Sequence, residues 1–168
     1  MLVLNVVATL GALAAAIASW LSVRVSARSV RVTQSAVEGQ MYYTLLERYS
    51  EPEMASALST LRDWKEMHGE GFAEKWREAL DNRDPGAEKV NQARRHVSHF
   101  FQRAWALYDA GYADKRFVEA VGKHFLGTQI FLMIVEPLEQ VLNPNYDRKS
   151  FNGFREICGE GPYKTLKY

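Results

Sequence analysis

The chain has 168 residues, a formal net charge of +1 and a single cysteine. When the three arginines that follow the apolar N-terminus are set aside from the 21 Lys and Arg, 18 remain against 20 Asp and Glu. A nucleic-acid-binding domain usually carries a clear basic excess, so we expect no nucleic acid partner. One cysteine also excludes a disulfide within the chain.

The first 23 residues predict a transmembrane anchor. Residues 2–23 carry no charged side chain, and 22 helical residues rise about 33 Å, enough to cross a hydrocarbon core of about 30 Å. Arg24, Arg28 and Arg31 follow, and basic residues beside a span stay in the cytoplasm, among anionic lipid headgroups. We therefore expect a single-pass protein of the inner (plasma) membrane, with its N-terminus outside and its C-terminal domain in the cytoplasm.

Two other interpretations of this segment stay open. A cleaved signal peptide would begin with basic residues, but residues 1–10 contain none, although the alanine-rich run through Ala18 resembles a cleavage site. A buried core helix is the second alternative. Three features favour a transmembrane helix over both alternatives: Gly11, the many alanines and the arginines at one end.

Small residues recur at intervals of three and four along the anchor, which places them on one face of a helix. Such a face lets another transmembrane helix approach closely. We expect it to contact an integral-membrane protein or a second copy of the chain. The residues of this face are Ala8, Gly11, Ala12, Ala15, Ser19 and Ser22.

Residues 24–49 predict a juxtamembrane helix that continues from the anchor without a break. No Gly or Pro occurs between Val23 and Val37, and Gly39 costs only about 1 kcal/mol relative to Ala. An apolar stripe follows this helix. Its members are Val30, Val37, Met41, Leu45 and Tyr49.

Residues 50–158 predict one all-α domain, because apolar residues recur every three or four positions and not every two. Ser50 and Glu53 predict a capping box, and Pro52 is tolerated in the first turn of the helix that they begin. We expect this helix to run to about His68, with Gly69 ending it.

Three further helices are predicted from their caps and apolar faces. Residues 72–80 form the first, and Asp84 begins a long central helix over residues 85–108, with Gly111 as its C-terminal cap. Asp114 begins the third, through Phe117 and Val121.

The most apolar internal segment, residues 125–135, is too short to cross a membrane. We expect a buried core helix that kinks or ends near Pro137. A turn at residues 143–145 precedes a last helix through Phe151, Phe154 and Ile157. Residues 159–168 form a C-terminal tail.

Two segments lie between the N-terminal span and the predicted helix that begins at Asp114. They are residues 94–101 (Arg-Arg-His-Val-Ser-His-Phe-Phe) and residues 106–112 (Ala-Leu-Tyr-Asp-Ala-Gly-Tyr). This arrangement resembles a family of bacterial membrane-anchored proteins of unknown function. The resemblance covers residues 94–157 and the layout of the anchor. It implies a helical fold and a membrane location, and it brings no catalytic residues.

His96, His99 and His124 are the first candidates for metal ligands. Histidines three apart are a weak metal signal, and neither a Glu-x-x-His pair nor a Cys-x-x-Cys pair accompanies them. Glu136 and Glu139 could act as paired carboxylates, but acidic residues also suit the first turn of a helix after a proline. We therefore predict no catalytic residue, metal site or cofactor.

Arg95, His99 and Arg103 recur every four residues and form one cationic helix face. A solvated surface is the simpler explanation of this face, and an anion or an acidic partner is the alternative. We expect a non-catalytic accessory or scaffolding subunit of a larger membrane protein complex. A membrane-tethered sensor or effector that binds a small anionic ligand is the alternative function, and an enzyme with an unfamiliar site stays open.

Overall fold

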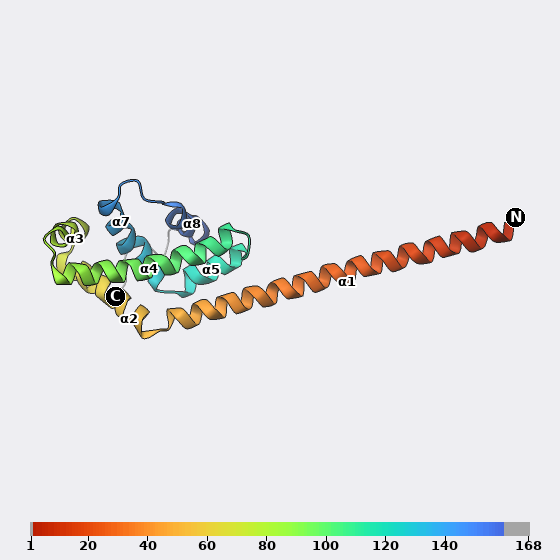
Figure 1. Ribbon diagram of the computed structural model, residues 1–168, viewed down its shortest axis with the longest axis horizontal. Helices are drawn as coiled ribbons and strands as arrows, with labels where there is room; N and C mark the ends of the chain where they lie inside the picture. Colours follow the sequence, from red (N-terminus) through yellow and green to blue (C-terminus); the bar gives the residue numbers. More distant parts are fainter. Residues whose placement is uncertain (1, 160–168) are drawn as a thin grey trace. The chain divides into compact units, whose positions relative to one another are not determined.

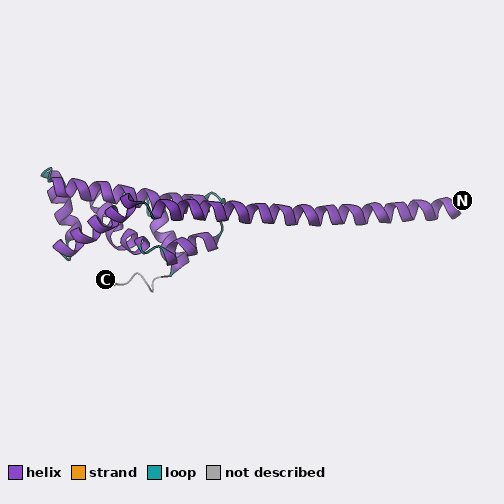
Figure 2. Ribbon diagram, turned by 90° about the horizontal axis from the view of Figure 1, so that it is seen from below, coloured by secondary structure: helices purple, strands orange, loops and turns teal. Residues whose placement is uncertain are grey.

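The computed structural model describes the backbone of residues 2–159 and the side chains of residues 18–159. All regular elements in this described range are helices, which confirms the predicted all-α fold (Figure 2). The chain divides into two compact units, residues 1–41 and residues 42–168.

Helix α1 (Leu2–Tyr49) is unbroken over 48 residues (Figure 1). This confirms that the N-terminal helix continues well past Val23. Gly39 does not interrupt it, because a helix interior tolerates a glycine at a cost of about 1 kcal/mol.

Within the residues that the structure describes in full, no single helix is long and apolar enough to cross a membrane. Most of the predicted anchor, residues 1–23, lies outside those residues. Two helical segments, Lys115–His124 and Gly127–Leu142, meet at 91° and together have the length and hydropathy of a broken span. The side chains of residues 125–135 are for the most part buried in the second unit.

Helix α2 (Pro52–His68) begins without the predicted capping box. Its N-cap is Glu51, and no side chain caps it. Ser50 instead donates its hydroxyl hydrogen bond backwards, to the carbonyl of Leu46 at 2.8 Å. The prediction was wrong because the serine hydroxyl bonds back to the last turn of α1, at a carbonyl that also accepts the amide of Ser50 at 3.0 Å. Gly69 ends α2 as predicted, with φ 62°.

The next helices begin and end close to their predicted boundaries: α3 (Phe72–Asp81), α4 (Pro85–Asp109) and α5 (Lys115–His124). Asp84 caps α4 by accepting a 2.9 Å hydrogen bond from the amide of Ala87. Asp114 caps α5 in the same way, from Phe117 at 3.2 Å. Gly111 follows α4 with φ 75°, a backbone conformation that favours glycine.

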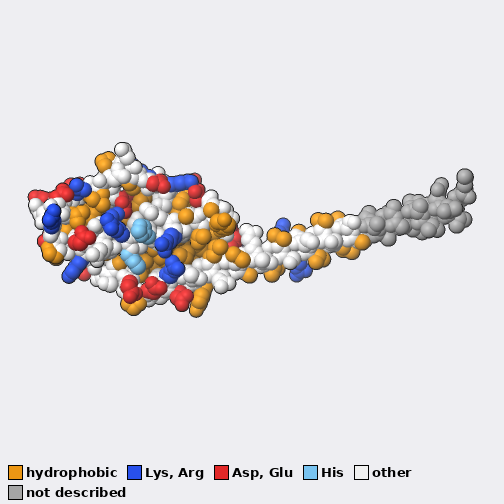
Figure 3. Space-filling model, viewed as in Figure 1, with side chains coloured by type: hydrophobic (Ala, Val, Ile, Leu, Met, Phe, Trp, Pro, Cys, Tyr) orange, Lys and Arg blue, Asp and Glu red, His pale blue; other side chains and the backbone are white. Residues whose placement is uncertain are grey.

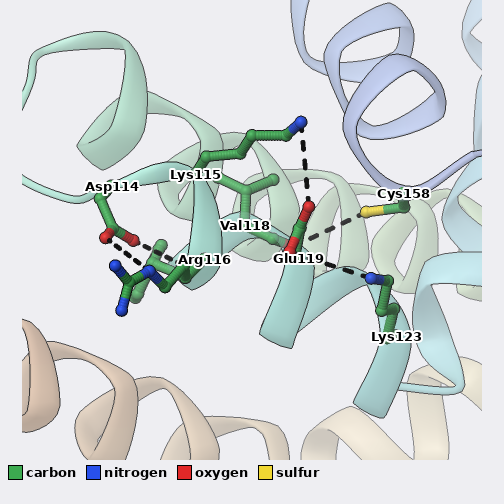
Figure 4. A network of polar contacts seen from close by, with 8 residues as sticks. Asp114, Lys115, Arg116, Val118, Glu119, Lys123 and Cys158 are labelled. Carbon is green, nitrogen blue, oxygen red and sulfur yellow. Dashed lines mark hydrogen bonds and ion pairs between the residues drawn. The ribbon is translucent and has the colours of Figure 1, made fainter.

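Short-range ion pairs cover the outer surface of α5 (Figure 4). Glu119 lies between Lys115 and Lys123, at 3.9 Å from each ammonium group. On the inner side, the thiol of Cys158 donates to the carbonyl of Val118 at 3.7 Å. Cys158 therefore joins the last helix to α5.

The helix irregularity that we expected near Pro137 takes the form of a π-helix. Helix α6 (Gly127–Ile130) leads into the π-helix η1 (Phe131–Val135) and then into α7 (Glu136–Leu142) without leaving helical conformation. The amide of Glu136 donates to the carbonyl of Phe131, five residues back. Proline has no amide hydrogen and its ring crowds the preceding turn, so the wider π turn lets the helix pass through Pro137.

The core forms where the last helix, α8 (Lys149–Cys158), packs against α4, α5 and η1. The ring of Phe131 stacks on Phe151 at 4.2 Å and on Phe101 at 4.9 Å between centroids. Phe154 meets Phe101 edge to face at 5.7 Å. Stacked and edge-to-face pairs each add about 0.5–1.5 kcal/mol beyond the area they bury.

Substitution of Gly153 by alanine tests this packing. A Cβ there would lie 2.0 Å from the ring of Trp105, so Gly153→Ala should lower the free energy of unfolding by about 1–3 kcal/mol. Gly39→Ala is the matched control, because nothing lies within 4 Å of its Cβ. Chemical denaturation of both variants measures the difference, and equal stability would contradict the close packing of α8 on α4.

Candidate functional site

Only part of the predicted transmembrane partner face can be examined. The side chains of Ala8, Gly11, Ala12 and Ala15 lie outside the described residues. Ser19 and Ser22 are exposed on α1. Their contact with a second helix therefore stays a prediction.

The three arginines that follow the predicted anchor lie on one exposed face of α1. Arg24, Arg28 and Arg31 line a shallow hollow of about 750 Å³ together with Leu21 and other apolar residues. The guanidinium of Arg24 lies 4.2 Å above the ring of Trp20. A cation above an aromatic face is a favourable pair that suits a polar–apolar boundary.

A second face of α1 carries an exposed apolar row. Val23, Val30 and Val37 are 66%, 65% and 45% exposed, and their spacing of seven residues places them on one side of the helix. The arginines lie on another side. We call these three valines the valine row.

The predicted cationic face of α4 is exposed, but its members do not converge on one point. Arg103 and His99 line a hollow of about 350 Å³, and Arg95 does not. His96 joins them from α4, while Arg48 comes from the end of α1 and Glu51 from the start of α2. We call Arg48, Glu51, His96, His99 and Arg103 the basic hollow.

The floor of the basic hollow is apolar. Leu45, Met54 and Phe100 form it, and at most 7% of each residue is exposed. Histidine and basic side chains lie next to one another on the face of the second unit seen in Figure 3. Apolar surroundings lower the local dielectric and strengthen the attraction of an anion to these cations.

Sequence reasoning missed Arg48 and Glu51 as members of this hollow. Neither residue belongs to a motif: Arg48 lies in the last turn of α1, and Glu51 is the N-cap of α2. Only the fold of the second unit brings them to α4. His124, which was grouped with His96 and His99 as a candidate metal ligand, ends α5 and does not line the hollow.

A wider and more open hollow adjoins the first one between α2 and α4. Its volume is about 740 Å³, and His96 lines both. Lys89 lies on its α4 side and Glu53 on its α2 side. No group of three or more His, Cys, Asp or Glu in the described part of the chain is arranged to hold a metal ion.

Glu136 and Glu139 each pair with an arginine and do not face each other across an open site. Glu139 pairs with Arg94, which also donates to Asn91 at 3.0 Å. Glu136 is 5% exposed and pairs with Arg155 of α8. These ion pairs hold α7 against α4 and α8, so the structural interpretation of the two carboxylates fits their geometry.

The environment of these pairs shifts two pKa values. Burial lowers the pKa of Arg94, and the charge of Glu139 opposes that shift. Tyr146 donates a 2.7 Å hydrogen bond to Glu136, and burial together with this carboxylate raises the pKa of its phenol to about 12. Neither partner could be predicted from the sequence, because each pair joins separate helices or loops.

No family model, curated protein or solved structure matches the chain.

Because Arg94 and Glu139 form an ion pair, we expect substitutions of the two residues to have non-additive effects on the free energy of unfolding. Glu139→Met should lower the free energy of unfolding by about 3–5 kcal/mol, because it leaves the buried guanidinium without its carboxylate. Arg94→Met combined with Glu139→Met should cost less than Glu139→Met alone, since both charges are then gone. Denaturant titrations measure both changes, and additive losses would show that the two residues do not interact.

The raised pKa of Tyr146 predicts that the free energy of unfolding falls at alkaline pH. Its pKa of about 12 in the folded chain exceeds the ordinary value of 10.0, so the folded state retains the proton longer than the unfolded state. The stability from this group is complete below pH 10 and falls as the pH rises through about 12. Tyr146→Phe should show a smaller decline than the parent in unfolding titrations over this window. Tyr43→Phe, at an exposed position, should leave the decline unchanged, and identical profiles for all three proteins would refute the assignment.

Proposed function

We propose that this protein is a non-catalytic accessory or scaffolding subunit of a larger membrane protein complex. Residues 1–23 anchor it as a single span, and the helical domain lies in the cytoplasm. Partners bind through the transmembrane helix and through the helical domain. The arrangement of α1 is the main support for this proposal.

The valine row carries the proposal. A helix that simply spaces a domain from a membrane would expose polar side chains, yet Val30 and Val37, which follow the proposed span, are exposed on the described part of α1. Burying such side chains contributes about 1.5–3 kcal/mol each. Their seven-residue spacing places them on one side of α1, which suits another helix lying alongside.

The last turns of α1, from residue 42 onward, belong to the second unit and pack on its core. The ring of Tyr49 stacks on Phe125 at 4.3 Å. Its hydroxyl accepts a 2.6 Å hydrogen bond from the amide of Gly127. Burial raises the pKa of this phenol, consistent with a rigid, desolvated contact.

Binding of a small anionic ligand by a membrane-tethered sensor or effector is a second candidate function. One specific observation favours it: two arginines and two histidines from α1 and α4 line the same small hollow. The two functions are compatible, because the basic hollow and the valine row involve different residues.

Extraction of the untagged protein from its native membrane in mild detergent, followed by native mass spectrometry, tests the accessory function. We expect a complex with at least one other membrane protein. Val37→Arg should release that partner, because a charge replaces a side chain of the valine row. Ser35→Arg is the matched control, since Ser35 is exposed on the arginine side of α1. A parent protein that is recovered alone would contradict the proposal.

A further inference from the structure

Two arginines of the basic hollow have no carboxylate partner in the described chain. Arg94 and Arg155, in the same domain, each form an ion pair. No hydrogen bond or ion pair engages the guanidinium of Arg48 or Arg103 among the described residues, although both line a hollow of about 350 Å³. The two positive charges of Arg48 and Arg103 exceed the single negative charge of Glu51. The net charge of the hollow is therefore positive even when both histidines are neutral.

The donors of the hollow suit a tetrahedral oxyanion better than a carboxylate. Each guanidinium presents up to five N–H donors, and each neutral imidazole of His96 and His99 presents one more. A carboxylate offers two oxygens, whereas a tetrahedral oxyanion can accept from several directions at once. The volume lies at the lower end of the range for small-molecule sites, which is about 300–1,000 Å³.

Glu51 distinguishes phosphate from other tetrahedral anions. Sulfate has no proton at neutral pH, so it would meet the Glu51 carboxylate only with repulsion. A hydrogen phosphate group carries a P–OH that can donate to this carboxylate. A carboxylate on the wall of an otherwise basic site therefore favours a phosphate that retains a proton.

We propose that the basic hollow binds a phosphate group that retains a proton, with Arg48, His96, His99 and Arg103 as donors and Glu51 as acceptor. The inference rests on the second proposed function and names its ligand class. The buried side chains of Leu45, Met54 and Phe100 lie beneath the hollow and close it from the core side. Inorganic phosphate and a lipid headgroup phosphate share this chemistry.

Isothermal titration calorimetry of the full chain in a zwitterionic detergent tests the proposal with inorganic phosphate and with sulfate. We expect phosphate to bind and sulfate to bind at least about tenfold more weakly, a difference that the loss of one charged hydrogen bond would produce. Arg103→Gln should weaken phosphate binding about tenfold or more. Arg62→Gln is its matched control, because Arg62 is exposed on α2 outside the hollow, and it should leave phosphate binding unchanged.

Glu51→Gln tests the selectivity directly. It should strengthen sulfate binding and weaken phosphate binding, so that the preference for phosphate disappears. Glu53→Gln is the control, since Glu53 lines the neighbouring hollow and not this one. A short-chain phosphatidate that displaces phosphate in the parent would identify a lipid headgroup as the source. Failure to displace it would identify a soluble phosphate.

The remaining outcomes distinguish a failure of the phosphate assignment from a failure of anion binding at the hollow. Equal binding of phosphate and sulfate, both weakened by Arg103→Gln, would overturn the phosphate assignment and leave anion binding in place. No heat with either anion would overturn both. An equal loss in Arg62→Gln and Arg103→Gln would show that the anion binds outside the hollow.

Discussion

The packing of Phe101 against Phe131 and Phe154 is the constraint on which the rest of the second unit depends. These three side chains are fully buried and come from α4, η1 and α8. They fix the rotation of α4 about its own axis. Once Val97 and Phe101 face the core, residues two positions further on, His99 and Arg103, must lie on the outer side. The core packing therefore determines which basic side chains can reach the basic hollow.

A second contact completes the hollow from the other side. Tyr49 is held by Phe125 and by the amide of Gly127, and Arg48 immediately precedes it in α1. The same contact that joins the end of α1 to the domain therefore also brings Arg48 to α4. A ligand or partner at the hollow would contact the last turn of α1 and α4 together.

The sequence predicts those features that depend on neighbouring residues. Asp84 and Asp114 cap α4 and α5 as expected, because each carboxylate lies three residues from the amide that it accepts. The capping box at Ser50 failed because two helices meet there and the serine serves the end of the first. The sequence indicates an irregularity near Pro137 but not its form, since a π-helix is a less common response to proline than a break.

The candidate site was predictable only on α4, where His99 and Arg103 share a helix face. Arg48 and Glu51 reach it through the fold, and no local pattern indicates that approach. The ion pair of Arg94 with Glu139 also has no local sequence pattern, because the two residues are 45 positions apart. Such contacts depend on how whole helices pack, so they cannot be inferred from spacing along the chain.

Photo-crosslinking in the native membrane tests the central claim most directly, because it reports what touches α1 without extraction. A photoreactive amino acid at Val37 should give a covalent adduct with a second protein. The same group at Ser35, on the arginine side of the helix, should give no such adduct. Protein adducts of equal yield at both positions, or adducts with lipid alone at Val37, would contradict the account of α1 as a partner-binding helix.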